Sequence, residues 1–570
     1  MANRKEENTE ETLVDKVVGQ LEEAHESDNA TEISDAEIDG IEVDDEIDQQ
    51  TEITNSDGTK YFLIERVKGK RKLTDEEKKE IKKKYQENSR LNQPITAKFL
   101  LKFTIPTILS FVVMGIFGLI DGIFAMRGIN YSAFAAVNVV FPFVMFTAAL
   151  GAMLTMGGCA LVVKLKGQKK KEEARRIFTM LAVVVFSVSA FISSIGWFIR
   201  RPIVRLLGAR GDGVALALEY IQPLIVMVPF VMLGIFFVQF VIADGRPLLG
   251  MAMGISASIV STSLNAIFLF GFDMGLMGLA LATGLGYSVS AVVGSIYFTF
   301  NRKGTLFFVK PKWDIRALGR AALNGISEAI TIMAGVVTVI VLNNTLMDIA
   351  GERLMYMGDG VFIGVPMGEA YVAIAGIAWA AQNVFAALFF GYVAGVAPIT
   401  SYNYGKKKKY GKDREVGAER HANIKKLYKK SLIIVFSLSI LAMVLTNIFA
   451  NTLLRIYEIT PNDPVVGFMH PMAIRAIRIM SLGFILMGIN VFATGWFTAF
   501  NDGLVSGIMS ALRSFVFMAG LLALMPRIFG LDGAWFAMPI VETLAICVTT
   551  FFLLKMGKKY HYLEEKKKQV

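Results

Sequence analysis

Four charged side chains lie inside long apolar stretches of this sequence, and they are the residues best placed to do chemistry. Asp121 and Glu328 are carboxylates, while Arg513 and Glu542 fall in consecutive stretches near the C-terminus. A charged group in apolar surroundings is costly and commonly marks an ion or substrate site. A carboxylate in a partly dry cavity takes up and releases protons near neutral pH. We therefore predict that Asp121 carries ion coupling, with Glu328 as the alternative position.

Uncharged polar side chains in the same stretches extend the candidate site. They offer amide groups that bind an ion or a substrate without adding charge. The candidates of this kind are Asn138, Gln222, Asn265, Asn344 and Gln382.

Twelve apolar stretches position these side chains. Most are about 20 to 28 residues long, enough to cross ~30 Å of hydrocarbon as a helix. Hydrophobic residues make up 54% of the chain, which is far above the level of soluble proteins. The predicted spans are residues 103–126, 133–163, 177–199, 214–241, 248–270, 276–300, 321–347, 370–401, 431–454, 473–500, 504–526 and 534–554.

The polar loops between these spans recur halfway along the chain. A lysine-rich loop begins with Lys166-Gly167 after the second span and with Tyr404-Gly405 after the eighth, and Asp244-Gly245 before the fifth span matches Asp502-Gly503 before the eleventh. Matched loops indicate an internal repeat, and an even number of spans per half makes the repeat parallel. We predict an all-α integral membrane protein of twelve transmembrane helices, in two parallel six-helix repeats that form a V-shaped bundle.

Within this architecture, Arg513 and Glu542 should lie at similar depths. The eleventh and twelfth spans run in opposite directions, and each residue lies well inside its span. A buried ion pair is the expected arrangement. The N-lobe is predicted to comprise residues 92–305, and the C-lobe residues 306–556.

The basic residues predict the orientation. Loops on the side of the N-terminus carry most of the Lys and Arg residues, so both termini of this multi-pass cell-membrane protein are expected in the cytoplasm. We expect the basic rim to contact anionic lipids of the inner leaflet. Nucleic acid is not an expected partner, because no soluble module presents the charge. A monomer is expected.

The two ends of the chain are strongly charged. Residues 1–58 are acidic and lack aromatic side chains, which predicts a disordered cytoplasmic tail. Residues 59–91 form a basic juxtamembrane segment, in which Thr74 and Glu77 predict a capping box at the start of a short helix. Residues 557–570 are predicted to be a basic cytoplasmic tail. A regulatory role of the N-terminal region is the alternative to a purely solvated one.

Motifs of enzymes and of ATP-driven pumps are missing from the sequence. There is no Gly-x-x-x-x-Gly-Lys-Ser/Thr phosphate loop. Cys159 and Cys547 lie in separate spans and suggest neither a disulfide nor a metal site. We predict a protein that is not an enzyme and needs no cofactor beyond a coupling proton or sodium ion.

Several strings resemble the multidrug and toxin extrusion (MATE) family. They occur in family order over about residues 92–556 and include Ile105-Pro106, Leu119-Ile120-Asp121-Gly122-Ile123-Phe124, Gly157-Gly158-Cys159, Asn324-Gly325-Ile326-Ser327-Glu328, Pro398-Ile399-Thr400-Ser401-Tyr402-Asn403-Tyr404-Gly405, Ala511-Leu512-Arg513 and Asp532-Gly533-Ala534-Trp535-Phe536-Ala537-Met538-Pro539-Ile540-Val541-Glu542. Each string alone is weak, whereas their order and spacing are specific.

The resemblance implies an antiporter that expels amphipathic, often cationic, small molecules by alternating access as protons or sodium ions enter. Asp121 matches the carboxylate of the family's first span, and Asn265 a polar residue of the fifth. Leu269 stands where the family usually has Asp, which puts strict proton coupling in doubt. The alternatives are a lipid-linked precursor or polysaccharide flippase of the same superfamily, and a non-transporting membrane scaffold that uses the acidic tail.

Overall fold

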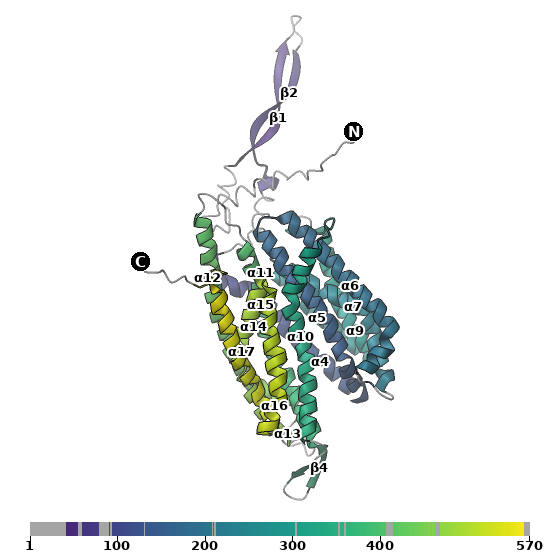
Figure 1. Ribbon diagram of the computed structural model, residues 1–570. Coiled ribbons are helices and arrows are strands. Elements are labelled where there is room, and N and C mark those ends of the chain that lie inside the picture. Colours follow the sequence, from purple (N-terminus) through teal and green to yellow (C-terminus); the bar gives the residue numbers. More distant parts are fainter. Residues whose placement is uncertain are drawn as a thin grey trace, which may run out of the picture. The chain divides into compact units, whose positions relative to one another are not determined.

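The computed structural model describes residues 17, 41–54, 60–78, 91, 94–129, 131–207, 209, 213–301, 305–350, 354–357, 361–405, 414–457, 459, 461 and 468–563. The chain divides into two compact units, and the larger one spans Ile95–Arg302 and Leu306–Val570. The larger unit is almost entirely helical (Figure 1). It contains all the candidate site residues.

Over the described residues, eleven helices are long and apolar enough to cross a membrane, and a bent pair supplies a twelfth span. The N-lobe consists of α4 (Ala97–Gly128), α5 (Tyr131–Gly167), α6 (Lys171–Leu206), α7 (Gly213–Ala243), α8 (Pro247–Ala266) with the π-helix η1 (Ile267–Gly271), and α9 (Gly275–Phe300). The C-lobe consists of α10 (Ile315–Ala350), α11 (Met367–Gly405), α12 (Arg414–Ile456), the pair α13 (Met469–Ser481) and α14 (Phe484–Ala499) bent by 47°, α15 (Gly503–Ala511) with the π-helix η2 (Leu512–Ala519) and α16 (Gly520–Phe529), and α17 (Gly533–Gly557). The predicted all-α membrane fold is confirmed.

Polar caps begin several of these helices. Thr96 Oγ1 accepts the amide of Phe99 at 3.0 Å at the start of α4. Asp314 Oδ1 accepts the amide of Ala317 at 2.9 Å at the start of α10. That backbone hydrogen bond holds the pKa of Asp314 below its ordinary value. Because a helix begins with unpaired amides, these side chains define where the spans start.

The two lobes repeat the same local structure at matched positions. In the N-lobe, Asp244 Oδ2 accepts the hydroxyl of Tyr297 at 2.8 Å, which ties the turn before α8 to the end of α9. In the C-lobe, Asp502 accepts the hydroxyl of Tyr560, which ties the turn before α15 to the segment after α17. Burial and this carboxylate raise the pKa of Tyr560. The loop repeat in the sequence therefore corresponds to a repeat of side-chain contacts.

The lobes pack together through glycines near one end of the bundle. We call this the basic end; it carries the loops that follow Gly167, Phe300 and Gly405. A Cβ on Gly325 of α10 would lie 1.9 Å from the carbonyl oxygen of Met153 in α5. Such an approach is possible only for residues without side chains, as in other helix pairs in membranes. Figure 1 shows α5 and α10 side by side in this region.

A second contact between the lobes joins α4 and α11. Thr107 Oγ1 donates to the carbonyl of Gly391 at 2.8 Å, and Gln239 of α7 donates to the carbonyl of Ala394 at 3.2 Å. Farther from the basic end, a Cβ built on Gly335 or Gly376 meets no atom within 4 Å. The closest glycine contacts between the lobes therefore lie toward the basic end.

The smaller unit contains a hairpin that departs from the sequence prediction. Strand β1 (Glu42–Thr54) lies in the segment predicted to be disordered, and it pairs antiparallel with β2 (Lys60–Lys72). The register sets an acidic strand against a basic one, with the pairs Glu42↔Lys72, Asp44↔Lys70, Glu46↔Lys68 and Asp48↔Arg66. The ladder partner of residues 42–54 lies in the basic segment that follows, and the composition of the acidic segment alone does not show this pairing.

The predicted capping box is present next to this hairpin. The amide of Thr74 donates to Glu77 Oε2 at 2.8 Å, and the amide of Glu77 donates to Thr74 Oγ1 at 3.3 Å. A second hairpin, β3 (Leu354–Met357) with β4 (Val361–Pro366), connects α10 to α11 at the end opposite the basic one. This hairpin lies outside the predicted spans, so the spans themselves remain helical.

Candidate functional site

Two adjoining cavities lie between the lobes. The larger, about 60 Å³, is lined by Phe111 and Met156 of the N-lobe and by C-lobe residues that include Glu328, Phe390 and Arg513. The smaller, about 10 Å³, lies beside Met156, Glu328 and Gln239. Spaces of this size hold a few water molecules and are too small for a drug-sized ligand. The two cavities share part of their lining and together form one small candidate site between the lobes.

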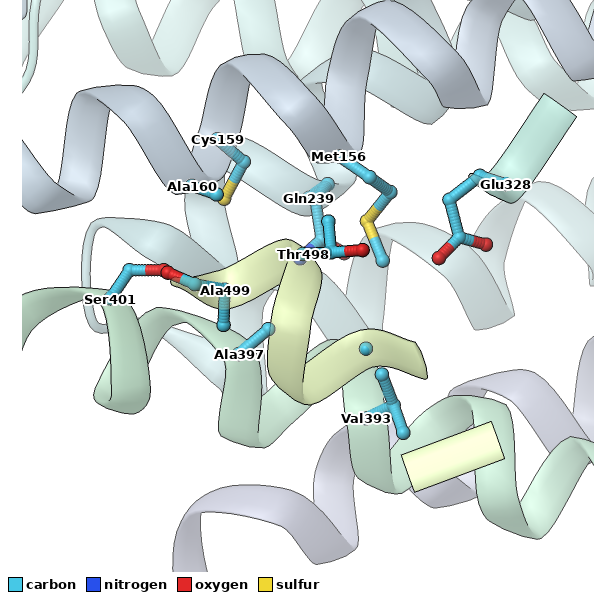
Figure 2. Close-up of a pocket in the computed structure, with 11 residues that line it drawn as sticks. Met156, Cys159, Ala160, Gln239, Glu328, Val393, Ala397, Ser401, Thr498 and Ala499 are labelled. Atoms are coloured by element: carbon cyan, nitrogen blue, oxygen red, sulfur yellow. The ribbon is translucent and has the colours of Figure 1, made fainter. Parts of the chain in front are cut away.

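Glu328 is the charged residue that lines both cavities, which also share Met156 and Val393. It follows Gly325 in α10, where glycine packing brings α5 to within contact distance, so its side chain lies at the junction of the lobes. Figure 2 shows its carboxylate extending toward Met156. No hydrogen bond or ion pair reaches this carboxylate from the described residues. A carboxylate without a counter-charge in such a place is neutralised by a proton or a bound cation.

Arg513 and Glu542 form the buried ion pair that the sequence predicts. Arg513 Nη2 and Nε lie 2.8 and 3.0 Å from Glu542 Oε1, and Nε lies 3.2 Å from Oε2. Glu542 is fully buried, and the Arg513 side chain is 12% exposed. The bidentate geometry is the strong form of this pair. Because its charge is compensated, Arg513 contributes little net charge to the cavity that it lines.

Two further side chains complete the network around Glu542. Asn490 Nδ2 donates to Glu542 Oε2 at 2.7 Å and to the backbone carbonyl of the same residue at 3.1 Å. Thr549 Oγ1 donates to Asn490 Oδ1 at 2.7 Å. Both carboxylate oxygens of Glu542 therefore accept hydrogen bonds, as a buried charge requires.

A second buried ion pair lies in the N-lobe, at the end of α5. Lys166 Nζ lies 3.3 Å from Asp244 Oδ1, and both side chains are less than a tenth exposed. The sequence places Lys166 among the loop charges that face the leaflet. That interpretation is wrong for this residue, because the turn at Asp244 folds back over the end of α5. The spacing of Lys166 and Asp244 in the sequence gave no sign of the contact.

Comparison with known proteins shows which family has this arrangement. A family model described as MatE matches residues 106–267 and 414–522, one segment in each lobe. The chain belongs to the MATE family. It is thus a multi-pass membrane protein, and the predicted family membership is confirmed. Proteins of this family are exporters, which agrees with the prediction that the chain is not an enzyme.

The relatives cover the helical part of this MATE protein. The multidrug export protein MepA of Staphylococcus saprophyticus is 24% identical over 462 residues, which are 80% of this chain and 93% of that protein. MepA of Staphylococcus aureus strain MRSA252 is 23% identical over 78% of this chain and 91% of its own length. Both alignments extend well beyond a single lobe.

Solved structures confirm the fold. A crystal structure of MATE in complex with MaL6 matches with a TM-score of 0.74 at 19% identity, over 84% of this chain and all of that one. An outward-facing multidrug resistance MATE transporter matches with a TM-score of 0.72 at 19% identity, over 83% of this chain and 98% of that one.

The other predicted site residues of this MATE protein are spread over the bundle. Asp121 lies in α4, but its side chain is outside the described part of the structure. Asn138 and Asn344 are exposed, and Gln222 is half-buried. Their assignment to the site stays a prediction. The structure brings together Glu328, Arg513 and Glu542 around the C-lobe side of the cavity.

Two more predicted residues are buried away from the cavity walls. Asn265 is 1% exposed and lies at the end of α8, just before η1, which contains the buried Leu269. Gln382 of α11 is buried and donates to Met538 Sδ at 2.8 Å. Both side chains contribute to packing within a lobe.

The matched π-helices distinguish the fifth and eleventh spans. η1 follows α8, and η2 begins at Leu512, so Arg513 lies in the first turn of the wider helix. π-helical turns are uncommon and occur frequently at functional sites. Apart from Gly271, neither π-helix contains a proline or a glycine that would mark it in the sequence. The two π-helices were therefore not predicted from the sequence.

Proposed function

We propose that this protein is a secondary active exporter, an antiporter that expels amphipathic, cationic small molecules by alternating access as protons or sodium ions enter. The observation that carries this proposal is the uncompensated carboxylate of Glu328 in the central cavity. A group that must be neutralised, and that lies where both lobes meet, is suited to exchange one cation for another.

The surroundings of Glu328 support a cationic, amphipathic substrate. Among the residues that line the two cavities, Glu328 and Arg513 are charged, and Arg513 is neutralised by Glu542. The remaining charge is therefore negative. Met156, Phe111 and Phe390 supply soft, polarizable surfaces, which adapt to ligands of different shape. The relatives named multidrug export protein MepA fit this chemistry.

The lobe packing supports alternating access. Glycine contacts hold the lobes together at the basic end, whereas a Cβ at Gly335 or Gly376, farther along α10 and α11, would meet no atom within 4 Å. Exchange between this arrangement and its opposite requires the lobes to separate where Gly325 meets Met153. A flippase of lipid-linked precursors would need uncompensated arginines in the cavity, whereas the one arginine there is paired.

Efflux of ethidium from proteoliposomes tests the proposal. We compare Glu328→Gln with Asp121→Asn and with Glu219→Gln, a control carboxylate whose Oε1 accepts the amide of Met277 at the start of α9. The proposal predicts gradient-driven efflux in the wild type and the control, and at least about a tenfold slower initial rate for Glu328→Gln. Loss only in Asp121→Asn would move coupling to the N-lobe, and full activity in both would exclude either carboxylate.

The proposed orientation has a separate test. We propose that the basic end faces the cytoplasm of the cell and that both termini lie there, because Lys and Arg gather at this end. A cysteine placed at Lys426 should react with maleimide only after the membrane is permeabilised. A cysteine at Asp273, in the segment between η1 and α9 at the opposite end, should react in intact cells, and the reverse pattern would invert the topology.

A further inference from the structure

The third and ninth spans end in the same local structure. At the end of α6, the amide of Ala209 donates to the carbonyl of Val204 at 3.1 Å, and at the end of α12, the amide of Ile459 donates to the carbonyl of Leu454 at 2.9 Å. The same turn therefore closes both helices at the end opposite the basic one. It presents an arginine followed by an aliphatic residue in each lobe, namely Arg205-Leu206 and Arg455-Ile456.

These side chains project away from the bundle. Arg205 and Arg455 are exposed, Leu206 is 87% exposed and Ile456 is 45% exposed. In the N-lobe, the chain also bends at Ile199, where the backbone is non-helical. An arginine beside an exposed aliphatic side chain combines a charge with a surface that water disfavours.

The two arginines differ from others at the same end of the bundle. Arg475 lies 3.2 Å from Asp532, and Arg527 lies 4.0 Å from Asp348. No carboxylate among the described residues lies within ion-pair distance of Arg205, Arg455 or the exposed Arg201. Their charges are therefore available to an anion outside the chain.

The depth of these arginines matches that of lipid phosphates. In α12, residues 431–454 separate Lys430 at the basic end from Arg455, and in α6, residues 177–199 separate Arg176 from the arginines at 200 and 201, with Arg205 about one turn beyond them. Stretches of this length rise about 35 Å as helices, slightly more than the ~30 Å hydrocarbon layer. The guanidinium groups thus lie at the level of the headgroups, with the exposed aliphatic side chains beside them.

We propose that these two helix ends are matched phospholipid anchors. In each, the guanidinium of Arg205 or Arg455 binds a lipid phosphate, and Leu206 or Ile456 inserts among the upper acyl carbons; Arg201 adds a second cation to the N-lobe anchor. A planar guanidinium suits a phosphate because it donates two parallel hydrogen bonds. A headgroup with net negative charge, such as that of phosphatidylglycerol, is preferred over a zwitterionic one.

The occupant follows from position and charge. Both anchors lie on membrane-spanning helices that also expose apolar side chains such as Phe198, which is 82% exposed. A soluble acidic protein would not cover those side chains, whereas lipid does so on both lobes at once. The site is distinct from the basic end, whose lysines lie on the other side of the membrane.

Native mass spectrometry of the full-length protein in neutral detergent tests the proposal. Phosphatidylglycerol is titrated into the wild type, into Arg201→Gln/Arg205→Gln/Arg455→Gln, and into the control Arg475→Gln/Arg527→Gln. Each surface arginine contributes about a fivefold change in affinity for an anionic lipid. We expect the triple variant to carry fewer bound phosphatidylglycerol molecules than the wild type at equal lipid concentration, with the lost sites at least about tenfold weaker, and the control to stay within about twofold of the wild type. Sites at the basic end are common to all three proteins and are the lipids that the triple variant retains.

Two further measurements keep the result unambiguous. The corresponding triple Lys variant retains the charges and should recover most of the binding, which separates loss of charge from misfolding. Soluble glycerophosphoglycerol at millimolar concentration should not displace the lipid. Unchanged binding in the triple Gln variant, equal loss in the control, or displacement by the soluble headgroup would overturn the proposal.

Discussion

Removing the charge of Glu542 should destabilise the C-lobe strongly. Glu542→Gln keeps the shape of the side chain but replaces one carboxylate oxygen by an amide group that donates. Arg513 now donates to a fully buried carboxylate over 2.8 to 3.2 Å. In the variant it would lie beside a second donor, with its own charge uncompensated. Breaking a buried pair from one side costs about 3–5 kcal/mol.

A double variant shows how much of this loss of stability comes from leaving Arg513 unpaired. In Arg513→Met/Glu542→Met both charges are absent, and Asn490 Nδ2 still donates to the backbone carbonyl of residue 542, at 3.1 Å in the wild type. Replacing both members of a buried pair by apolar residues of similar volume is often close to neutral. We therefore expect the double variant to recover to within about 1–2 kcal/mol of the wild type.

The assay is reversible unfolding in mixed detergent micelles, followed by circular dichroism for the wild type, Glu542→Gln, Arg513→Met, Glu542→Met and the double Met variant. The free energies of unfolding of the wild type, the two single Met variants and the double Met variant form a thermodynamic cycle that isolates the coupling of the pair. A loss below about 1 kcal/mol in Glu542→Gln would refute the reasoning, because it would mean that the pair is hydrated in the membrane protein. If the double variant folds but no longer exports ethidium, the Arg513 charge acts in transport as well as in stability.

Two other perturbations follow from the packing. Gly325→Ala should force the basic ends of the lobes apart, because its Cβ would lie 1.9 Å from the Met153 carbonyl oxygen. Spin labels at Arg176 and Lys426 should then report a longer distance between the lobes. Gly319→Ala in the same helix is the control and should leave this distance unchanged, because its Cβ would meet no atom within 4 Å. Equal distances in both variants would contradict the interface. Tyr560→Phe should lower the free energy of unfolding by about 1.5–3 kcal/mol, since a hydrogen bond to the Asp502 carboxylate is lost, and a stability equal to that of the wild type would show that the turn does not depend on it.

The sequence alone determined the architecture of this protein. Long apolar runs fix the spans because unpaired backbone groups cannot lie in lipid, and the matched loops at Asp244 and Asp502 reveal the repeat. The ion pair of Arg513 and Glu542 was also predictable, because two opposite charges at similar depth in adjacent antiparallel spans have few other partners. These are properties of local composition and order along the chain.

The tertiary structure decided which polar residues share a site. Glu328 faces the cavity, whereas Asn344 of the same helix is exposed, and uniformly apolar helices carry no periodic signal that separates these faces. The burial of Lys166 and the order of residues 42–54 depend on partners distant in the sequence, Asp244 in one case and the basic strand in the other. A contact between distant residues is set by how helices and strands pack, and for that reason only the folded chain shows it.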